Sequence, residues 1–305
     1  MTKPTLLILA AGMASRYGSL KQIDAFGPHG ETIIDYSIYD AINAGFEKVV
    51  FIIREEFLDT MREVFDKKLA GKIDVDYAFQ DYDLSKFGIN KTIERSKPWG
   101  TAHAVLSAKD MVNGPFCVIN ADDFYGADSF RKMADFLTTD VTDDRMALMG
   151  FQVGNTMSDY GYVSRGVCEV DQDGYLKSVT ERTNIYYAMD EATNQKSVVF
   201  EEAEVQYPLS PDARVSMNFW GFTPHIFSVA EEMFKEFVEI NSENPKSEFF
   251  IPSVPDFMVK NNMAGFRVLP TSSKWFGVTY KEDKPIVQES ISNLIAQGVY
   301  PEKLF

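Results

Sequence analysis

Apolar and polar positions alternate along the first half of the chain in a pattern typical of an α/β protein. Short apolar runs bounded by turn residues predict buried strands, and apolar residues repeated every three or four positions predict helices. The strands are expected at residues 5–10, 48–53, 73–79, 116–120 and 146–153, and the helices at residues 32–44, 57–69, 101–111 and 129–137. Strands that alternate with helices favour a three-layer, Rossmann-like α/β fold, in which helices cover a mostly parallel sheet.

The pattern changes after Gly154, where strand-like segments follow one another directly. Residues 160–170 and 175–180 flank Asp171-Gln172-Asp173-Gly174, which is typical of a β-hairpin turn. The acidic stretch 188–214 has little periodicity and is predicted to form an excursion over the surface. Strands are also expected at 215–222 and 266–269, and helices at 227–238, 254–260 and 284–296. We therefore expect a single domain over residues 1–305, whose second half (154–305) adds a mixed β extension to the first (1–153).

Composition places the chain among ordinary globular proteins, with 45% hydrophobic and 25% charged residues. It has no run of about 18 apolar residues, so no membrane span or membrane partner is expected. The N-terminus lacks the apolar core of a signal peptide, which favours a cytoplasmic protein. Cys117 and Cys168 each lie in an apolar, strand-like run and are expected to be packed thiols.

The formal net charge of −15 narrows the range of partners. A broad nucleic-acid-binding face would need clustered lysines and arginines, so nucleic acid is not expected as a partner. A small anionic substrate remains compatible with this charge. Its site would have to supply its own positive potential from a few cations, backbone dipoles and a metal.

The segment that follows the first strand has the character of a phosphate-binding loop. It reads Leu9-Ala10-Ala11-Gly12-Met13-Ala14-Ser15-Arg16, with Lys21 close behind. Small residues allow the backbone N–H groups to approach phosphate oxygens, while Arg16 adds a planar fork of donors and Lys21 a mobile charge. The segment is neither the Gly-x-Gly-x-x-Gly dinucleotide motif nor a Walker loop. A plain structural turn is the alternative.

Two further segments carry candidate chemistry. Asp122 and Asp123 follow the apolar run of the fourth strand, where a carboxylate can hold Mg²⁺ together with substrate phosphates. The alternative for this pair is a solvated turn or a helix cap. Gly100-Thr101-Ala102-His103-Ala104 opens a helix whose first N–H groups and Thr101 hydroxyl can face a base or a phosphate. Here the alternative is that Thr101 is an ordinary N-cap and His103 a partly exposed helix residue.

Taken together, these segments resemble those of the sugar-phosphate nucleotidyltransferases (NDP-sugar pyrophosphorylases). Leu9 to Arg16, followed by Lys21, matches the family's first strand and its Leu-x-x-Gly-x-Gly-Thr-Arg loop. The segment from Gly100 to Ala104 is similar to the Gly-Thr-x-His-Ala of uridylyl-transferring members. Asp122 matches the metal aspartate, and Phe124-Tyr125-Gly126 is similar to a motif of thymidylyl-transferring members. Tyr160-Gly161-Tyr162-Val163 and Glu181-Arg182 resemble the two sugar-site segments.

The resemblance implies that UTP or dTTP reacts with a sugar 1-phosphate to give an NDP-sugar and pyrophosphate, with Mg²⁺ as cofactor. Residues 1–153 would bind the nucleotide and residues 154–305 the sugar. The implied catalytic residues are Arg16, Lys21 and Asp122. The implied nucleotide-binding residues are Ala10, Ala11, Gly12, Met13, Ala14, Ser15, Gln80, Gly100 and Thr101. The implied sugar-phosphate-binding residues are Gly161, Glu181, Arg182 and Asn218.

The sequence departs from the family pattern at several of these positions. Ala14 replaces a glycine, Ser15 a threonine and Arg182 a lysine. The region of the family's second metal ligand aligns loosely with residues 274–279, which offer Gly277 or Thr279. Asp283, a few residues on, is the candidate second ligand, and its alternative role is that of a residue at a helix start.

Other functions remain open at this stage. One is a cytidylyltransferase that acts on a phosphorylated alcohol such as alditol or choline phosphate. A second is a non-catalytic protein that binds nucleotide sugars. A glycosyltransferase with an Asp-x-Asp metal site fits less well, because Asp122 and Asp123 are adjacent. The sequence does not indicate the oligomeric state.

Overall fold

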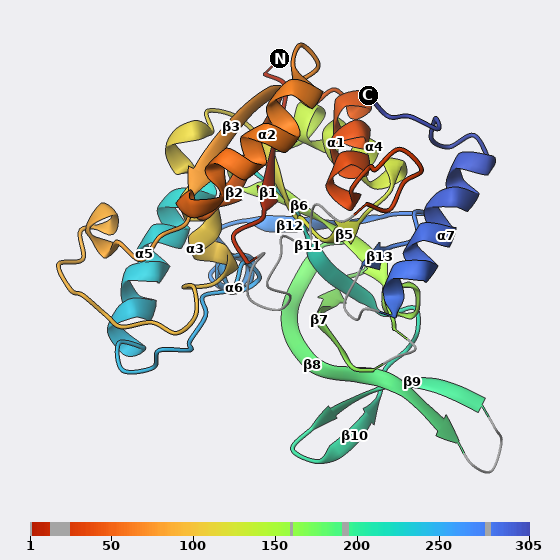
Figure 1. Cartoon of the computed structure of the whole chain (residues 1–305). Helices are drawn as coiled ribbons and strands as arrows, with labels where there is room; N and C mark the ends of the chain where they lie inside the picture. The colour runs from red at the N-terminus through yellow and green to blue at the C-terminus, as the bar shows by residue number, and fades with distance from the viewer. Residues whose placement is uncertain (1, 13–24, 159–160, 191–194, 278–281) are drawn as a thin grey trace.

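The computed structural model describes residues 2–12, 25–158, 161–190, 195–277 and 282–305. These residues form a large mixed β-sheet with helices packed against it (Figure 1). The strands are β1 (Thr5–Leu9), β2 (Lys48–Ile53), β3 (Asp74–Phe79), β4 (Phe116–Asn120), β5 (Asp123–Phe124), β6 (Arg145–Gln152), β7 (Val163–Val170), β8 (Leu176–Asp190), β9 (Gln195–Glu202), β10 (Val205–Pro208), β11 (Arg214–Phe222), β12 (Gly265–Pro270) and β13 (Phe276–Gly277). The helices are α1 (Ile33–Ala44), α2 (Leu58–Leu69), α3 (Thr101–Leu106), α4 (Ala127–Thr139), α5 (His225–Ile240), α6 (Ser253–Lys260) and α7 (Asp283–Ala296).

The main sheet joins a parallel half to an antiparallel half. Its strand order is β10-β9-β8-β7-β11-β4-β1-β2-β3, and β6 pairs with β11 and β12. Strands β4, β1, β2 and β3 run parallel to one another, whereas β11 pairs antiparallel with β4, β6 and β7. The predicted α/β class, with its mixed β extension, is confirmed.

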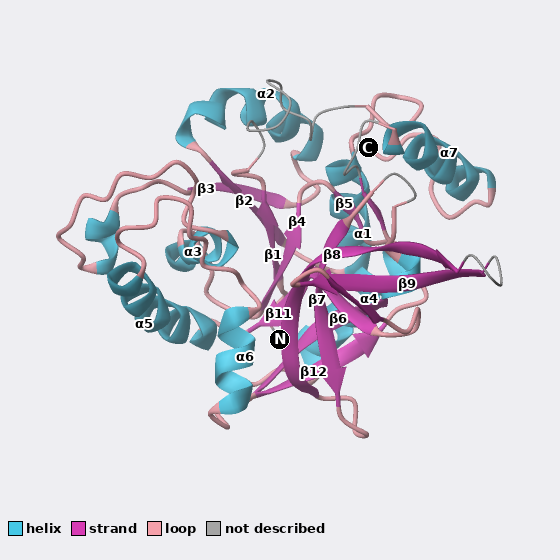
Figure 2. Cartoon of the chain, turned by 90° about the horizontal axis from the view of Figure 1, so that it is seen from below, coloured by secondary structure: helices cyan, strands magenta, loops and turns pink. Residues whose placement is uncertain are grey.

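Helices cover the parallel half on both faces, as the continuous apolar strands predicted. Leu6 and Ile8 of β1 pack into a core that includes residues of α1, α2 and α4. Leu7 points the other way, into a core that includes residues of α3, α5 and α6. Figure 2 shows these last three helices together on one side of the sheet. The side chains of successive strand residues therefore pack into two separate cores, one on each face of the sheet, which gives the expected three layers.

Local capping residues fix the ends of α1, which the sequence predicted closely. Thr32 and Asp35 form a capping box, in which Thr32 Oγ1 accepts from Asp35 N at 3.2 Å and Asp35 Oδ2 accepts from Thr32 N at 2.7 Å. Gly45 ends the helix with a left-handed φ of 95°. The predicted helix at 101–111 is shorter than expected, because α3 ends at Leu106 and a 3₁₀ turn follows at Lys109–Met111.

The antiparallel half contains the main error of the sequence prediction. The β7–β8 hairpin turns where expected, with Asp171 Oδ1 accepting from Asp173 N and Tyr175 N and with Gly174 at φ 85°. However, the predicted surface excursion at 188–214 contains the end of β8 and all of β9 and β10. These strands project away from the helices in Figure 1. All four residues of β10 are exposed, so the stretch lacks the alternation that would have revealed it.

Two smaller expectations concern the cysteines and the membrane. Cys117 and Cys168 are buried free thiols, as predicted. Among the helices of the described residues, none combines the length and the apolar character that a membrane crossing needs.

Candidate active site

Several of the predicted nucleotide and metal residues that the structure describes follow strands that end at one edge of the sheet. Because β1, β3 and β4 are parallel, the chain leaves all three at the same edge. Ala121 N donates to the carbonyl of Leu9 at 3.2 Å, which holds the ends of β4 and β1 side by side. At the end of β2, the carbonyl of Ile52 accepts from Ala10 N at 2.9 Å and the carbonyl of Ile53 accepts from Gln80 N at 2.8 Å.

Only the start of the phosphate-type loop lies within the described residues. Ala10 and Ala11 are buried at the end of β1, and Gly12 is exposed, with no atom of the described residues within 4 Å of the position that a Cβ would take. The predicted residues Met13, Ala14, Ser15, Arg16 and Lys21 lie outside the described residues, as do Tyr160 and Thr279. Their roles stay predictions.

The two aspartates after β4 differ in their surroundings. Asp122 is half-buried at the turn, whereas Asp123 is buried in β5. Asp123 Oδ2 accepts from Asn120 Nδ2 at 2.8 Å and lies 3.2 Å from the Tyr125 hydroxyl. That hydroxyl accepts from Asn120 N at 3.0 Å and donates to the carbonyl of Met217 at 2.8 Å. Asp123 is therefore part of a buried polar network and is not a solvated turn residue.

The protonation of Asp123 depends on its burial and on its charged neighbours. Burial, and next the nearby carboxylate of Asp122, raise the pKa of Asp123 to about 7. The Asn120 amide, the guanidinium of Arg165 and the Tyr125 hydroxyl oppose this rise. Two carboxylates this close repel each other, and a divalent cation beside them would relieve that repulsion.

The segment expected to supply a second metal ligand lies against these aspartates. Strand β13 pairs antiparallel with β5, with Gly277 opposite Asp123 and Phe276 opposite Phe124. The rings of the two phenylalanines stack with centroids 4.1 Å apart. A Cβ on Gly277 would lie 2.7 Å from Asp123 Oδ1, so only glycine leaves room for the carboxylate at this position.

Asp283 begins α7 and is buried, and its Oδ1 accepts from Ser158 Oγ at 3.3 Å. Among the described residues, no group of three or more His, Cys, Asp or Glu side chains is arranged to hold a metal. The assignment of Asp283 as a second ligand stays a prediction.

Asn218 reaches the site through an irregularity in β11. The pairing of β11 with β6 shifts register between Ser216 and Trp220. Within this bulge Asn218 has a φ of 59°, a left-handed conformation that is uncommon for residues other than glycine. Its side-chain amide donates to Oδ1 of Asn120 at 3.2 Å. A predicted sugar-site residue thus contacts the end of the strand that carries Asp122.

The predicted base-recognition segment is built around a glycine whose position leaves no room for a side chain. Gly100 has a φ of 104°, and a Cβ there would lie 2.4 Å from the carbonyl oxygen of Phe249. Gln80 Nε2 donates to the Gly100 carbonyl at 3.0 Å and contacts His103 Nδ1 at 3.2 Å. Gln80 and Gly100, both predicted to face the base, are therefore in direct contact.

The alternative interpretation of this segment is wrong on two points. The N-cap of α3 is Gly100, and Thr101 is the first helical residue, whose Oγ1 accepts from Ile251 N at 3.0 Å. His103 is buried against Phe87 and Phe234, where it was expected to be partly exposed. Burial lowers its pKa to about 4, so the imidazole is neutral at pH 7.

The predicted sugar residues occupy the antiparallel strands and the turn before them. Gly161 is half-buried just before β7, and Glu181 on β8 lies opposite Gly166 of β7. Arg182 forms an ion pair with Glu202 of β9 at 2.7 Å, and its guanidinium lies 4.5 Å from the ring centre of Phe200. The cation expected to bind the sugar phosphate is thus held by a carboxylate in this structure.

Sequence reasoning missed Arg165 of β7, a buried cation close to the aspartates. Its side chain is only 7% exposed. Burial lowers the pKa of Arg165 to about 10, and the charges of Asp123 and Glu181 oppose that shift. The sequence did contain an indication that Arg165 is buried, because the alternation of side chains along a strand places it on the same face as the apolar residues Val163 and Val167.

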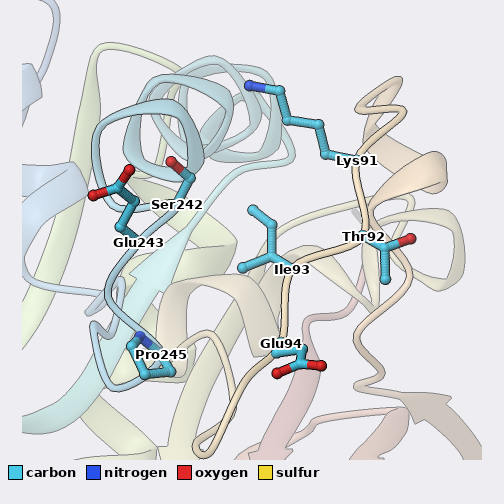
Figure 3. A pocket seen from close by; sticks show the side chains of 7 residues that line it. All are labelled: Lys91, Thr92, Ile93, Glu94, Ser242, Glu243 and Pro245. Carbon is cyan, nitrogen blue, oxygen red and sulfur yellow. The ribbon is translucent and has the colours of Figure 1, made fainter.

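A separate hollow of about 620 Å³ lies between the loop that precedes α3 and the segment after α5. Figure 3 shows its lining side chains, which are Lys91, Thr92, Ile93, Glu94, Ser242, Glu243 and Pro245. None of the predicted site residues lines it, so we assign it no part in the site.

Comparison with known proteins identifies the family. A model of the nucleotidyl transferase family matches residues 6–243, which is most of the chain. The chain belongs to this family. The motif resemblance is thereby confirmed, and the protein is a nucleotidyltransferase. No curated protein sequence matches the chain.

Several solved structures are similar to it. An inositol-1-phosphate CTP transferase from T. maritima has a TM-score of 0.62 at 14% identity, over 96% of both chains. A UDP-glucose pyrophosphorylase complexed with UDP-glucose has a TM-score of 0.60 at 15% identity, over 96% of this chain and 99% of that one. HddC from Yersinia pseudotuberculosis, complexed with GMP-PN, has a TM-score of 0.56 at 14% identity, over 94% of this chain and 99% of that one. At these identities the likeness shows a shared fold.

Proposed function

We propose that this nucleotidyltransferase joins UTP or dTTP to a sugar 1-phosphate and releases pyrophosphate. The observation that supports the proposal is that the start of the loop after β1, the turn after β4 and Asn218 lie at one edge of the sheet. The loop after β1 would hold the triphosphate, the turn after β4 a metal ion, and Asn218 the sugar. The contact between Asn218 and Asn120 links the last two of these groups.

The contacts of Gln80 favour uracil or thymine over cytosine. Both hydrogens of its Nε2 are directed to protein acceptors, the Gly100 carbonyl and His103 Nδ1. The amide therefore has only its carbonyl oxygen to offer to a base, as an acceptor. Uracil and thymine present a donor at N3, whereas N3 of cytosine is itself an acceptor. At the position of N3, an acceptor on the protein would match the first two bases and repel the third, which offers a donor only through its N4 amino group.

The donor set at the turn after β4 fits Mg²⁺. This ion takes oxygen ligands and commonly uses one or two carboxylates together with substrate phosphates. Asp122 is half-buried and adjacent to a second carboxylate, and Gly277 leaves space that a Cβ would fill. Asp122 would hold the ion, with Asp283 as a candidate second ligand. When bound, Mg²⁺ supplies positive charge that neutralises the phosphates as they react.

The chemistry needs alignment more than acid–base catalysis. A phosphate oxygen of the sugar 1-phosphate is already ionised near pH 7, since its second pKa is about 6, so no general base is required. It would attack the α-phosphorus in line with the departing pyrophosphate. In this scheme Arg16 neutralises the β- and γ-phosphates, and Lys21 bridges the α-phosphate and the attacking phosphate.

The sugar 1-phosphate would bind between β7, β8 and β11. Gly161, Glu181 and Asn218 would contact its hydroxyl groups, and Arg182 would bind its phosphate. Because Arg182 pairs with Glu202 here, the incoming phosphate must replace that carboxylate as its partner. Exchange of one anion for another leaves the guanidinium paired throughout.

Pyrophosphate release tests this proposal directly. The purified protein would be assayed with Mg²⁺, each common nucleoside triphosphate and a panel of sugar 1-phosphates. We expect turnover with UTP or dTTP, its loss in Lys21→Ala, and a weakened Mg²⁺ response in Asp122→Asn. Turnover only with CTP and an alditol or choline phosphate would replace the substrate assignment. Binding of a nucleotide sugar without turnover of any pair would make the protein a non-catalytic binder.

A further inference from the structure

Among the described residues, Arg165 is a buried arginine near the candidate site, and the hydrogen bonds that it donates go to neutral groups. Its Nε donates to Thr156 Oγ1 at 3.1 Å, its Nη1 to the carbonyl of Ser164 at 2.8 Å, and its Nη2 to the carbonyl of Thr156. Thr156 is itself fully buried. Among the residues that the structure describes, no carboxylate forms an ion pair with this guanidinium.

A buried charge without a direct counter-ion is costly, so its retention calls for a compensating role. Two carboxylates, Asp123 and Glu181, are near enough to act on Arg165 electrostatically. Both belong to segments with predicted site residues. The positive charge of Arg165 therefore acts on one carboxylate beside the proposed metal site and on one in the proposed sugar site.

Arg165 is also linked, through side-chain and strand contacts, to the turn that contains Asp122 and Asp123. Its guanidinium carbon lies 4.6 Å from the ring centre of Trp275, a residue that is itself buried. Trp275 directly precedes β13, which pairs with β5, the strand that contains Asp123. A Cβ on Gly277 would approach both Trp275 and Asp123, at 2.8 and 2.7 Å, so ring and carboxylate flank the same glycine.

We propose that Arg165 is a positioning residue that holds the Asp122–Asp123 turn in its metal-binding geometry by fixing Trp275 and β13 against β5. The role of the turn rests on the proposed function, whereas the link from Arg165 to the turn is a property of the protein without substrates. Both a planar guanidinium and its several fixed donors are needed, because one face stacks on Trp275 while the edge bonds to Thr156. A lysine in its place would keep the charge but lose the stack and the fork.

The chain offers a matched control in Arg95. The guanidinium carbon of Arg95 lies 3.8 Å from the ring centre of Trp99, and its Nη1 donates to the carbonyl of Asn244 at 2.9 Å. It is thus a second arginine stacked on a tryptophan and bonded to carbonyls, but it does not contact β5 or β13. Arg165→Lys and Arg95→Lys remove the same kind of interaction at two places.

Two readouts need no turnover. In hydrogen–deuterium exchange, Arg165→Lys should speed exchange in peptides that cover residues 120–125 and 273–277, and Arg95→Lys should not. In a Mn²⁺ titration followed by electron paramagnetic resonance, Arg165→Lys should weaken binding about tenfold, as loss of an outer-shell partner typically does. The Arg95→Lys variant should bind Mn²⁺ as the wild type does.

Trp275→Phe keeps the test informative if Arg165→Lys does not fold. The Trp275 indole N–H has no hydrogen-bond partner among the described residues, so phenylalanine breaks no hydrogen bond there. It should show a smaller effect of the same sign in both readouts. Wild-type exchange at the turn or wild-type Mn²⁺ affinity in both variants would overturn the proposal. If the wild type shows no turnover with any substrate pair but the readouts respond as expected, the proposed function fails and the role of Arg165 stands.

Discussion

The side-chain amide of Asn218 donates to Oδ1 of Asn120 at 3.2 Å and so joins the bulge of β11 to the end of β4. Asn120 also donates through Nδ2 to Asp123 Oδ2 at 2.8 Å. One amide side chain therefore connects the proposed sugar residue with the carboxylate next to Asp122. The left-handed backbone of Asn218 is the cost of this arrangement, and such strain is commonly found at functional sites.

Replacing Asn218 by glycine or by alanine should separate the strain from the amide contact. Both variants lack the amide, so both should raise the KM for the sugar 1-phosphate by about tenfold, as expected for one lost hydrogen bond. Alanine retains the left-handed strain and glycine does not, so Asn218→Ala should be about 1 kcal/mol less stable than Asn218→Gly in urea unfolding. Equal stability of the two would contradict the strain, and a wild-type KM in both would remove Asn218 from the sugar site.

Gln80→Met should weaken nucleotide binding and base selection together. The side chain keeps a similar length but can neither hold the Gly100 carbonyl nor accept a hydrogen bond from a base. We expect the KM for UTP or dTTP to rise about tenfold and the preference over CTP to fall. Gln152→Met is the control, since among the described residues the Gln152 side chain bonds only to the surface residues Asp212 and Asn155. Unchanged selectivity in Gln80→Met would show that the base is read elsewhere.

Gly277→Ala tests the fit of β13 against the aspartates. The added Cβ would lie 2.7 Å from Asp123 Oδ1 and 2.8 Å from the Trp275 ring, so the carboxylate or the indole ring must shift. Turnover should fall at least about tenfold, with a loss of stability of about 1–3 kcal/mol typical of overpacking. Gly265→Ala, another glycine in a strand, meets its nearest atom at 3.3 Å and should be far milder. A fully active Gly277→Ala would contradict the close fit.

The buried imidazole of His103 should make stability depend on pH in a defined direction. Its pKa is about 4 in the folded protein and about 6.5 in the unfolded chain. Between these values the unfolded chain binds more protons, so acidification destabilises the protein by up to about 3 kcal/mol. In His103→Asn this contribution is absent, and the carboxylates titrate in both proteins. The stability difference between wild type and variant should therefore shrink as the pH falls from 7 to 4. A constant difference would contradict the buried neutral state.

The sequence predicted the elements that carry a strong local signal. The apolar runs of β1, β2 and β4 and the Thr32 and Gly45 caps of α1 determine these elements within a few residues. Strand β10 was missed because all four of its residues are exposed, and β9 because its buried residues Val198 and Val199 are adjacent and so give no alternation. Strands β5 and β13 have two residues each, which is too short for any pattern, yet their pairing brings Gly277 to Asp123.

Candidate site residues that belong to short sequence motifs could be predicted. Surroundings that depend on packing between distant segments could not. The end of β1, Gly100, Gln80 and Asp122 were found from short motifs. The burial of His103 depends on Phe234, which is far away in the sequence, so local spacing could not show it. The contact of Arg165 with Trp275 likewise joins two distant segments.

Isotope-labelled substrate tests the central claim most directly. A sugar 1-phosphate with ¹⁸O in its non-bridging phosphate oxygens would be incubated with the protein, Mg²⁺ and UTP or dTTP, and the products followed by ³¹P NMR. In-line attack by that phosphate on the α-phosphorus predicts an NDP-sugar that carries ¹⁸O at the bridge between its two phosphorus atoms, together with unlabelled pyrophosphate. Label in the pyrophosphate, or an unlabelled bridge, would contradict the account.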